Sequence, residues 1–521
     1  MRCIQERWWA PPGRVRAGGW RGEPERGVDR MSGWQIDQAK LDQVGQLLTA
    51  CQDVSNHEAH LLALKMLEEH TKVHPDFGCY LLVVFCKMPS APAPLRHLAG
   101  IQLKNAIKER RMKEPELTYI RTEITGALGD SENTLRRTAA QIVTTICGRH
   151  DVPARIPNNQ PLQDWDGLLP GLLQMLNSGS EAHVEGAMST LRLLFEDHTD
   201  QLCVEGLAVT LQAIVARLVQ LLQAPQARQR ADAIYCVRML ILPMPNALVV
   251  HLNDFLRALL GLSKDPSPEV RKEICIALCI LAACKADFLA DPEIRSFVIE
   301  FMLWTTEKDD EYDVKKEACE FWQTVCESEE IPDDVLKPYL SRLTLVLLNG
   351  MVYSEDELIA LEEEEQKNSA ADVNPAMLHH QTKGTVVDEE EDEDEASDGT
   401  VEWTLRKCSA LGLDVISTHY KNEILDALLP HIHSKLQSSD WMVQESAVLA
   451  MGALAEGCEE GLIAKDYLAA FITHLVQGIL PSDKPLLRSI TCWTLSRSPL
   501  PLKDHSPSRK TLVSLPPGLK P

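Results

Sequence analysis

Aromatic residues are scarce in this chain of 521 residues, at 5% of the sequence, although hydrophobic residues as a whole reach 45%. Strands favour aromatic and β-branched side chains, so this balance favours helices rich in Leu, Ala and Val that pack on one another. Apolar runs of the roughly 20 residues that a membrane span needs are also missing. The longest run extends only from Ile274 to Ala283, so the sequence predicts no membrane insertion.

Paired CxxC spacings, which would indicate zinc, are missing although the chain holds 15 cysteines. Cys275, Cys279 and Cys284 lie in one apolar stretch. We expect such cysteines to be small core residues of a protein in a reducing compartment. The sequence therefore predicts no metal site.

Catalytic groupings are absent from the sequence as well. The pairs His379-His380 and His431/His433 stand beside no acid–base constellation. No Gly-rich phosphate loop is present. The sequence predicts neither an enzyme nor a cofactor.

Positive charge is in short supply, because 52 Lys and Arg face 76 Asp and Glu and leave a formal net charge of -24. Such a chain repels phosphate backbones and attracts positively charged partners over long range. The charge therefore predicts basic peptides as ligands and no direct contact with nucleic acid.

A turn followed by an Ala/Cys/Leu-rich amphipathic helix recurs along the chain. Its clearest copy is DPSPEVRKEICIAL, which begins at Asp265 and has Pro268 where a helix can start. One anchor residue per copy gives His57, Leu95, Leu135, Val184, Arg228, Val270, Val314, Leu405, Val443 and Leu487. The spacing is close to the roughly 40 to 47 residues of HEAT repeats, except between Val314 and Leu405.

This period predicts an all-α HEAT-repeat α-solenoid, wound as a right-handed superhelix of about ten helix pairs. The first helices of two pairs are expected at Leu168–Leu176 and Leu252–Leu262, and the second helices are expected to line an inner, concave wall. The expected organisation is a disordered extension over 1–33, repeats over 34–353, an acidic disordered loop over 354–399, repeats over 400–497 and a Pro-rich disordered tail over 498–521.

The wide interval contains a strongly acidic insertion whose few large apolar residues cannot repay the entropy of ordering. Its densest part is the run Glu389, Glu390, Glu391, Asp392, Glu393, Asp394 and Glu395. One interpretation is a solvated spacer. The other is a mobile anionic strand that competes with a basic ligand for the inner wall.

Several of these motifs resemble the transportin family of karyopherin-β nuclear import receptors, from about Trp34 to Arg497. The motifs are HPDFGCYLL, LRHLAGIQLKNAIK, DPSPEVRKEICIALCIL, YDVKKEACEFW, EWTLRKCSALGLDVI, WMVQESAVLAMGALAEGC and LLRSITCWTLSR. HEAT repeats alone are weak evidence, whereas the acidic loop directly before WTLRKCSA and the string CWTLSR are specific to the family.

The resemblance implies that the amino-terminal repeats bind the small GTPase Ran in its GTP form. The residues that match its Ran-facing positions are Gly100, Leu103, Lys104, Asn105, Arg136 and Arg137. A purely structural role stays open for some of them, because Leu103 suits a core and Arg136 can pair with neighbouring acids. The resemblance also implies nucleoporins as partners and shuttling between cytoplasm and nucleus through the nuclear pore.

Cargo of this family carries a basic or hydrophobic stretch that ends in a proline-tyrosine signal. The positions that resemble its binding site are Trp403, Ala410, Asp414, Leu449, Ile490 and Trp493. Ala410, Leu449 and Trp493 stand at nearly the same position in three repeats, which predicts a stripe across successive second helices. Such a stripe suits a core as well as a binding site, but tryptophans beside an acid also suit Pro and Tyr rings and a basic side chain. Leu411 stands where the family has a small residue.

The resemblance stops after Arg497, where a tail with six prolines follows. From this we expect about half of the family's repeats, and a second cargo subsite, to be absent. The leading hypothesis is an import receptor, complete or truncated, that releases its cargo on binding Ran-GTP. The alternative is a HEAT scaffold, such as a phosphatase scaffold subunit, or a truncated competitor that binds Ran-GTP without carrying cargo.

Overall fold

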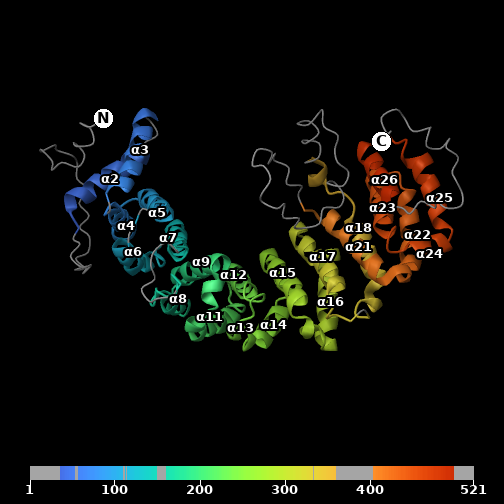
Figure 1. Ribbon diagram of the computed structural model, residues 1–521, viewed down its shortest axis with the longest axis horizontal. Helices are drawn as coiled ribbons and strands as arrows, with labels where there is room; N and C mark the ends of the chain where they lie inside the picture. Colours follow the sequence, from blue (N-terminus) through green and yellow to red (C-terminus); the bar gives the residue numbers. More distant parts are fainter. Residues whose placement is uncertain are drawn as a thin grey trace. The chain divides into compact units, whose positions relative to one another are not determined.

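The computed structural model describes residues 36–52, 57–74, 76–109, 112, 114–149, 160–332, 334–359 and 403–497. Within these ranges all regular secondary structure is helical. The helices follow one another in antiparallel pairs, as Figure 1 shows. The prediction of an all-α HEAT-repeat solenoid is confirmed.

Ten helix pairs follow one another in the described ranges. They are α2 (Gln38–Gln52) with α3 (His57–Val73), α4 (Phe77–Lys87) with α5 (Ala93–Lys108), α6 (Glu114–Ala127) with α7 (Asn133–Cys147), α8 (Leu168–Leu176) with α9 (Glu181–Asp197), α11 (Ala208–Leu221) with α12 (Ala227–Arg238), α14 (Leu252–Gly261) with α15 (Pro268–Cys284), α16 (Pro292–Lys308) with α17 (Tyr312–Glu327), α18 (Leu340–Gly350) with α21 (Leu405–Tyr420), α22 (Leu425–Leu436) with α23 (Trp441–Leu454), and α25 (Tyr467–His474) with α26 (Pro485–Arg497).

Short helical segments lie between or within some of these pairs. They are α10 (Thr199–Leu202), η1 (Glu205–Leu207), α13 (Asn246–Val249), η2 (Ala286–Leu289), η3 (Lys337–Tyr339), η4 (Lys421–Ile424), α24 (Glu459–Ala464) and η5 (Leu475–Ile479). Each predicted anchor residue lies in, or begins, the second helix of its pair.

The acidic insertion falls between α18 and α21, the two helices of a single pair. Residues 355–359 are helical, so the expected loop begins later than residue 354. This turn is capped reciprocally, because the Ser354 amide donates to Glu357 Oε2 at 2.8 Å and the Glu357 amide donates to Ser354 Oγ at 3.2 Å. The run from Glu389 to Glu395, the expected extension over 1–33 and the expected tail over 498–521 lie outside the described residues.

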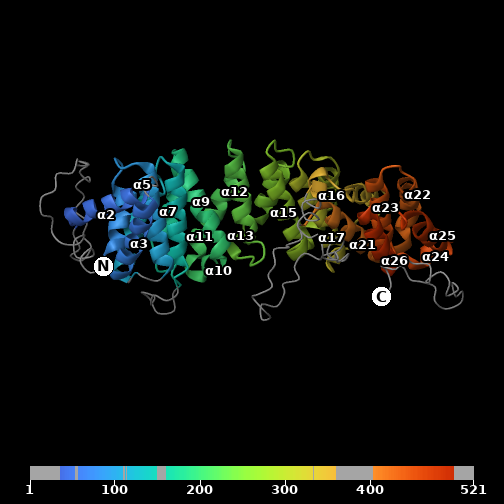
Figure 2. The same ribbon diagram turned by 90° about the horizontal axis from the view of Figure 1, so that it is seen from above.

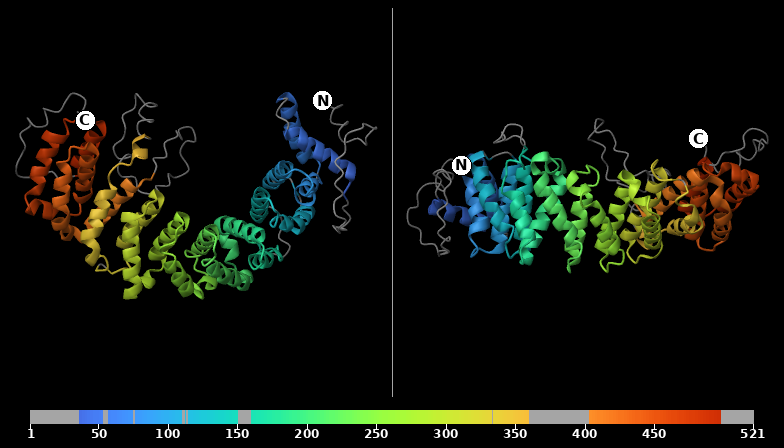
Figure 3. Two further views of the ribbon diagram at one scale, coloured as in Figure 1. Left: turned by 180° about the vertical axis from the view of Figure 1, so that it is seen from behind. Right: turned by 90° about the horizontal axis from the view of Figure 1, so that it is seen from below.

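The chain divides into two units, residues 1–273 and 274–521. In the first unit, the second helices α5, α7, α9 and α12 pack on one another in sequence order, and the first helices α4 and α6, and α8 and α11, do the same. In the second unit, α17, α21, α23 and α26 form the row of second helices, with α16, α18 and α22 as the row of first helices. Each unit is thus a stack of two helical layers (Figures 2 and 3).

Buried ion pairs join the turn of one pair to the second helix of the pair before it. Arg230 on α12 donates from Nε and Nη2 to the two carboxylate oxygens of Asp265, at 2.7 and 2.8 Å. The same carboxylate accepts from the Ser267 amide at 2.9 Å, and α15 then begins at Pro268, as predicted. Arg96 and Asp130 form the corresponding pair between α5 and the turn before α7. These contacts keep successive repeats in register.

The sequence predicted that all three cysteines of the apolar stretch are core residues, but only one of them is fully buried. Cys275 is fully buried and Cys279 is half-buried, but Cys284 is exposed because it is the last residue of α15. The expectation of a core position was therefore wrong for Cys284. Elsewhere burial raises the pKa of the Cys51 thiol to about 11 and that of the Cys147 thiol to about 12, so these residues remain neutral thiols at neutral pH.

Candidate functional sites

Two of the residues proposed to face Ran serve the packing of α5. Gly100 allows this helix to lie against α4 and α7, because a Cβ atom there would stand 2.7 Å from both Phe85 Cε2 and Thr138 Cγ2. Leu103 is fully buried on the same helix. Gly100 has no side chain and the side chain of Leu103 is buried, so neither residue presents a side chain to a partner.

Lys104, Asn105 and Arg137 retain access to solvent. The Lys104 ammonium donates to the Gln141 side-chain oxygen at 3.3 Å, which links α5 to α7. Arg136 is buried, by contrast, and its guanidinium donates to two turn carbonyls and pairs with Glu185 on α9. The six candidates thus divide into three packing residues and three surface residues, and their role toward Ran stays a prediction.

Three of the six residues proposed to bind cargo lie in the packed interior. Ala410 on α21, Leu449 on α23 and Ile490 on α26 are each 0% exposed. Like the predicted stripe of Ala410, Leu449 and Trp493, they lie on successive second helices, but they are not open to a ligand because α23 is packed against α21, α22 and α26. Any part that these three residues play in binding stays a prediction.

Small residues explain how α26 covers α23 so closely. A Cβ atom on Gly452 would lie 2.3 Å from Cζ3 of the Trp493 ring and 2.8 Å from Thr494 Oγ1. The Thr494 hydroxyl also donates to the Val448 carbonyl at 3.0 Å. The indole of Trp493 therefore rests on the backbone of α23, and its residue is 9% exposed.

Trp403 reaches the surface at the other end of the candidate region. It is half-buried, and its indole Nε1 donates to Glu320 Oε1 of α17 at 3.1 Å. The next residue, Thr404, caps α21 by accepting from the Lys407 amide at 3.3 Å. The start of α21 thus places a tryptophan and an acid side by side.

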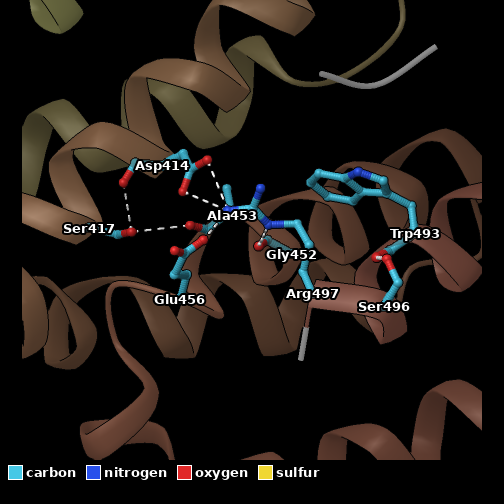
Figure 4. Close-up of polar contacts among 8 residues, drawn as sticks. All are labelled: Asp414, Ser417, Gly452, Ala453, Glu456, Trp493, Ser496 and Arg497. Carbon is cyan, nitrogen blue, oxygen red and sulfur yellow. Dashed lines mark hydrogen bonds and ion pairs between the residues drawn. The ribbon is translucent and has the colours of Figure 1, made fainter. Parts of the chain in front are cut away.

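The most developed polar arrangement in the region surrounds Asp414, and we call Asp414, Trp493 and Arg497 the Asp414 cluster (Figure 4). Nη2 of Arg497 lies 3.0 Å from each carboxylate oxygen of Asp414, and Nε donates to the Gly452 carbonyl at 3.1 Å. The guanidinium carbon stands 5.3 Å from the centre of the Trp493 ring, within the range of a cation–π contact. Glu456 adds a carboxylate 3.3 Å from Nη2. Three successive second helices meet at this guanidinium.

Arg497 was not among the residues that the sequence analysis selected. It belongs to the string CWTLSR, four residues after Trp493, and residues four apart share one face of a helix. That spacing was the available signal. The pairing with Asp414, 83 positions away in the sequence, required the register between repeats.

A fully buried ion pair links the same helices from within. Arg406 on α21 and Glu445 on α23 are 1% and 0% exposed, and Nη2 of the arginine contacts Oε1 of the glutamate. The guanidinium stacks on the Tyr353 ring, 4.1 Å from its centre. Burial raises the pKa of the Glu445 carboxyl to about 6, although Arg406 opposes the rise. This pair fixes the position of α23 beneath the Asp414 cluster.

The described ranges lack two further features. No helix there is both long enough and apolar enough to cross a membrane. The same ranges hold no group of three or more His, Cys, Asp or Glu side chains arranged to bind a metal ion.

Comparison with known proteins gives matches along most of the chain. The Importin-beta N-terminal domain model matches residues 63–130, and the HEAT-like repeat model matches residues 441–497. Mouse Transportin-1 is 35% identical over 481 residues, which are 89% of this chain and 51% of the relative. Importin subunit beta-2 of Schizosaccharomyces pombe is 31% identical over 473 residues, or 85% of this chain and 50% of the relative.

Solved structures agree on the fold. Yeast importin-beta (Kap95p) has a TM-score of 0.63 and 16% identity, and the match covers 88% of this chain and 50% of that one. The fold is therefore that of a karyopherin solenoid. The chain belongs to the karyopherin-β family, and the relatives that resemble it in sequence are transportins and importin β-2 subunits. These relatives are transport receptors and not enzymes, in agreement with the prediction from sequence. The chain spans about half the length of the curated relatives it matches.

Proposed function

We propose that this protein is a nuclear import receptor that binds proline-tyrosine nuclear localisation signals through the second helices of its carboxy-terminal repeats. The observation that carries this proposal is the Asp414 cluster, in which an aromatic face, a guanidinium and a carboxylate meet on α21 and α26. The similarity to transportins over most of the chain supports the same role.

Trp493 and Asp414 offer complementary contacts for the end of such a signal. The indole, whose residue is 9% exposed, would supply an apolar contact for a proline or tyrosine ring. The carboxylate accepts hydrogen bonds within reach of that face. The net charge of -24 attracts the basic part of the signal over a longer range.

The amino-terminal repeats are proposed to bind Ran in its GTP form through Lys104, Asn105 and Arg137, which keep access to solvent. Two solved structures have a similar fold. One shows Kap95p, whose binding induces the switch loops of RanGDP to adopt the GTP-bound conformation, and the other is a complex of Kap95 with Nup1. On this basis we propose Ran and nucleoporins as partners and shuttling between cytoplasm and nucleus. The acidic run Glu389 to Glu395 is proposed to compete with the basic cargo once Ran-GTP has bound.

A competition experiment tests this function. A fluorescent basic peptide ending in Pro-Tyr is titrated with the full chain, and Ran loaded with a non-hydrolysable GTP analogue is then added. We expect the peptide to bind with measurable anisotropy and to be released by Ran-GTP, because ligands that disfavour each other lower each other's affinity by the same factor. Ran-GDP serves as the control nucleotide state and should release little peptide.

A variant of the acidic run tests its proposed role in peptide release. Replacing the seven acids from Glu389 to Glu395 by Gln and Asn should leave Ran binding intact and weaken peptide release. Release that is as complete as in the wild type would contradict the role given to this run. A chain that binds Ran-GTP but no peptide would instead be a competitor for Ran that carries no cargo.

A further inference from the structure

Helix α16 carries two large aromatic side chains that face solvent. The helix belongs to the row of first helices in the second unit, where it packs against α17, α18 and η2 (Figure 1). On the side away from its buried residues, Phe297 and Trp304 are 45% and 48% exposed. Three exposed or half-buried acids share this side of the helix, namely Glu293, Glu300 and Glu307. We call these five residues the α16 stripe.

The spacing of the α16 stripe suits a second helix. Its residues follow one another at intervals of four, three, four and three positions, which places them along one line on a helix. The two aromatic rings are separated by two helical turns, or about 10 Å along the axis. The same alternation of threes and fours marks the positions of a coiled coil at which the partner helix inserts its side chains.

The two rings and the acid between them have capacity for a partner. Within the described ranges, neither Phe297 nor Trp304 makes an aromatic or cation–π contact, and the Trp304 indole N–H donates no hydrogen bond. Glu300 Oε2 accepts from Arg342 of α18 at 3.0 Å. Its Oε1 accepts from no described residue. The stripe therefore offers apolar surface, one indole donor and one carboxylate acceptor.

Arg342 shows how a basic side chain engages the α16 stripe. Its guanidinium lies 3.0 Å from Glu300 and 3.0 and 3.2 Å from Glu307, the acids on either side of Trp304 along the helix. Lys308 and Arg342 hold the pKa of the Glu307 carboxyl below its usual range, so this acid is ionised at neutral pH. Negative charge stays in excess, because the segment 291–311 holds seven acids and two bases. The stripe thus attracts a basic partner and repels an acidic one.

The structure of α16 also limits the conformation of the partner. Its backbone N–H and C=O groups bond within the helix, so an extended peptide on this face would find no backbone partners. A helical partner satisfies its own backbone and can place apolar side chains against both rings. A second copy of this chain would set one acidic stripe against another, and like charges oppose that contact.

We propose that the α16 stripe is a docking surface for a basic amphipathic helix of another protein, whose apolar side chains pack on Phe297 and Trp304 and whose Lys or Arg side chains pair with Glu293 and Glu300. The stripe lies in the row of first helices, whereas the Asp414 cluster lies on the second helices. The proposal therefore does not depend on the proposed function. A helix bound to the stripe leaves the Asp414 cluster free for peptide.

The test titrates the full chain with a fluorescein-labelled peptide helix of about 18 residues, or five turns. Leu occupies the a and d positions of this probe and Lys the flanking positions. One control peptide has Glu in place of every Lys, and another has the residues of the probe in shuffled order. Fluorescence anisotropy at physiological salt should show binding of the probe, no binding of the Glu peptide and weaker binding of the shuffled peptide.

Variants of the chain locate the bound helix. Trp304→Ala and Phe297→Ala should each lower the affinity for the probe about tenfold, as truncation of a contact aromatic does. Glu300→Gln should lower it about twofold and reduce its dependence on salt. Val209→Ala on α11, at 84% exposure, and Asp426→Asn on α22, at 85%, are the apolar and charged surface controls and should bind like the wild type. Thermal melting verifies that every variant is folded.

Three results would overturn the proposal. They are wild-type affinity in both Trp304→Ala and Phe297→Ala, equal binding of the probe and either control peptide, and absence of probe binding up to about 1 mM. A competition experiment adds a further check with an unlabelled basic peptide that ends in Pro-Tyr. This peptide should leave the labelled helix bound, whereas complete displacement would place the helix at the proposed cargo site and refute docking on α16.

Discussion

The second helices near the two ends of the described chain differ in how many of their charged motif residues remain accessible to solvent. On α5 and α7 the motif residues with apolar or small side chains are buried, while Lys104 and Arg137 extend toward solvent. On α21, α23 and α26 the charged side chains turn toward one another instead, as Arg406 with Glu445 and Arg497 with Asp414. Both regions therefore hold paired charges, since Arg96 pairs with Asp130 and Arg136 with Glu185, but only the first also keeps the motif residues Lys104 and Arg137 open to solvent.

Close packing at a glycine serves different neighbours in the two regions. Gly100 and Gly452 both permit close helix packing, but the first admits a phenylalanine ring from α4 and the second admits the Trp493 ring of the candidate site. In the carboxy-terminal region, packing and the proposed recognition therefore involve the same side chains. Variants there should affect stability and binding together.

The largest effect is expected from breaking the buried ion pair. Glu445→Ala leaves the Arg406 charge uncompensated in the interior, and we expect a loss of about 3–5 kcal/mol. Glu185→Ala removes the partner of Arg136 in the other region, where the glutamate is 34% exposed, and should cost clearly less. Thermal unfolding of both variants measures how much stability each one loses. Equal losses would contradict the deeper burial of Glu445 relative to Glu185.

A loss of similar or smaller size is expected from Leu449→Ala, at about 2–5 kcal/mol, because the removed atoms leave a cavity. Leu103→Ala in the amino-terminal region should lose a similar amount of stability, since both leucines are fully buried. The control is Ile463→Ala on α24, whose side chain is half exposed. If Leu449→Ala unfolds at the wild-type temperature, Leu449 belongs to an open wall after all.

Gly452→Ala should destabilise by about 1–3 kcal/mol through overpacking against the Trp493 ring. Gly126→Ala on α6 is its counterpart, because no atom lies within 4 Å of a Cβ there. That change should raise stability by roughly 0.5–1 kcal/mol, as Ala is the better helix former. Melting temperatures that move in the same direction would contradict the packing described for α23 and α26.

A smaller effect should appear as a dependence on pH. Burial raises the pKa of Glu445 in the folded chain from the usual 4.5 to about 6, so the folded state binds this proton more tightly than the unfolded state. The stability contribution of the group is then greatest below about pH 4.5 and falls as pH rises to about 6. Glu445→Gln cannot titrate, so the melting temperature of the wild type relative to this variant should decline over that window.

The smallest effect on stability is expected from Lys104→Ala, at less than about 0.5 kcal/mol, because the side chain is accessible and makes one long hydrogen bond. Its effect on Ran-GTP affinity should be larger than its effect on melting. Surface plasmon resonance with immobilised Ran checks this, with Lys108→Ala, exposed at the end of α5, as the neighbour control. Equal affinities for the two variants would remove Lys104 from the proposed contact.

The helix pairs were predictable from the sequence because their turns and apolar periods repeat. The first helix at Leu168–Leu176 and the start of α15 at Pro268 are found where they were expected. These features depend on local rules, namely capping, proline placement and the burial of one helical face. A period of about 40 residues then fixes how many pairs follow one another.

The exposure of the candidate site was not predictable in the same way. Helix α23 has the sequence WMVQESAVLAMGAL, which is apolar on nearly every side after Ser446, so its pattern marks no face as open. The pairing of Arg497 with Asp414 spans 83 positions and depends on the register of three helices. Local rules carry no information about such contacts.

The proposed function requires a proline-tyrosine peptide to bind at the junction of α21 and α26. The most direct test replaces the tyrosine of the peptide by the photoreactive p-benzoylphenylalanine and maps the cross-links to the chain by mass spectrometry. We expect cross-links on α21 and α26 near Asp414 and Trp493, and we expect excess unlabelled peptide ending in Pro-Tyr to abolish them. Specific cross-links that lie only on other helices would contradict it.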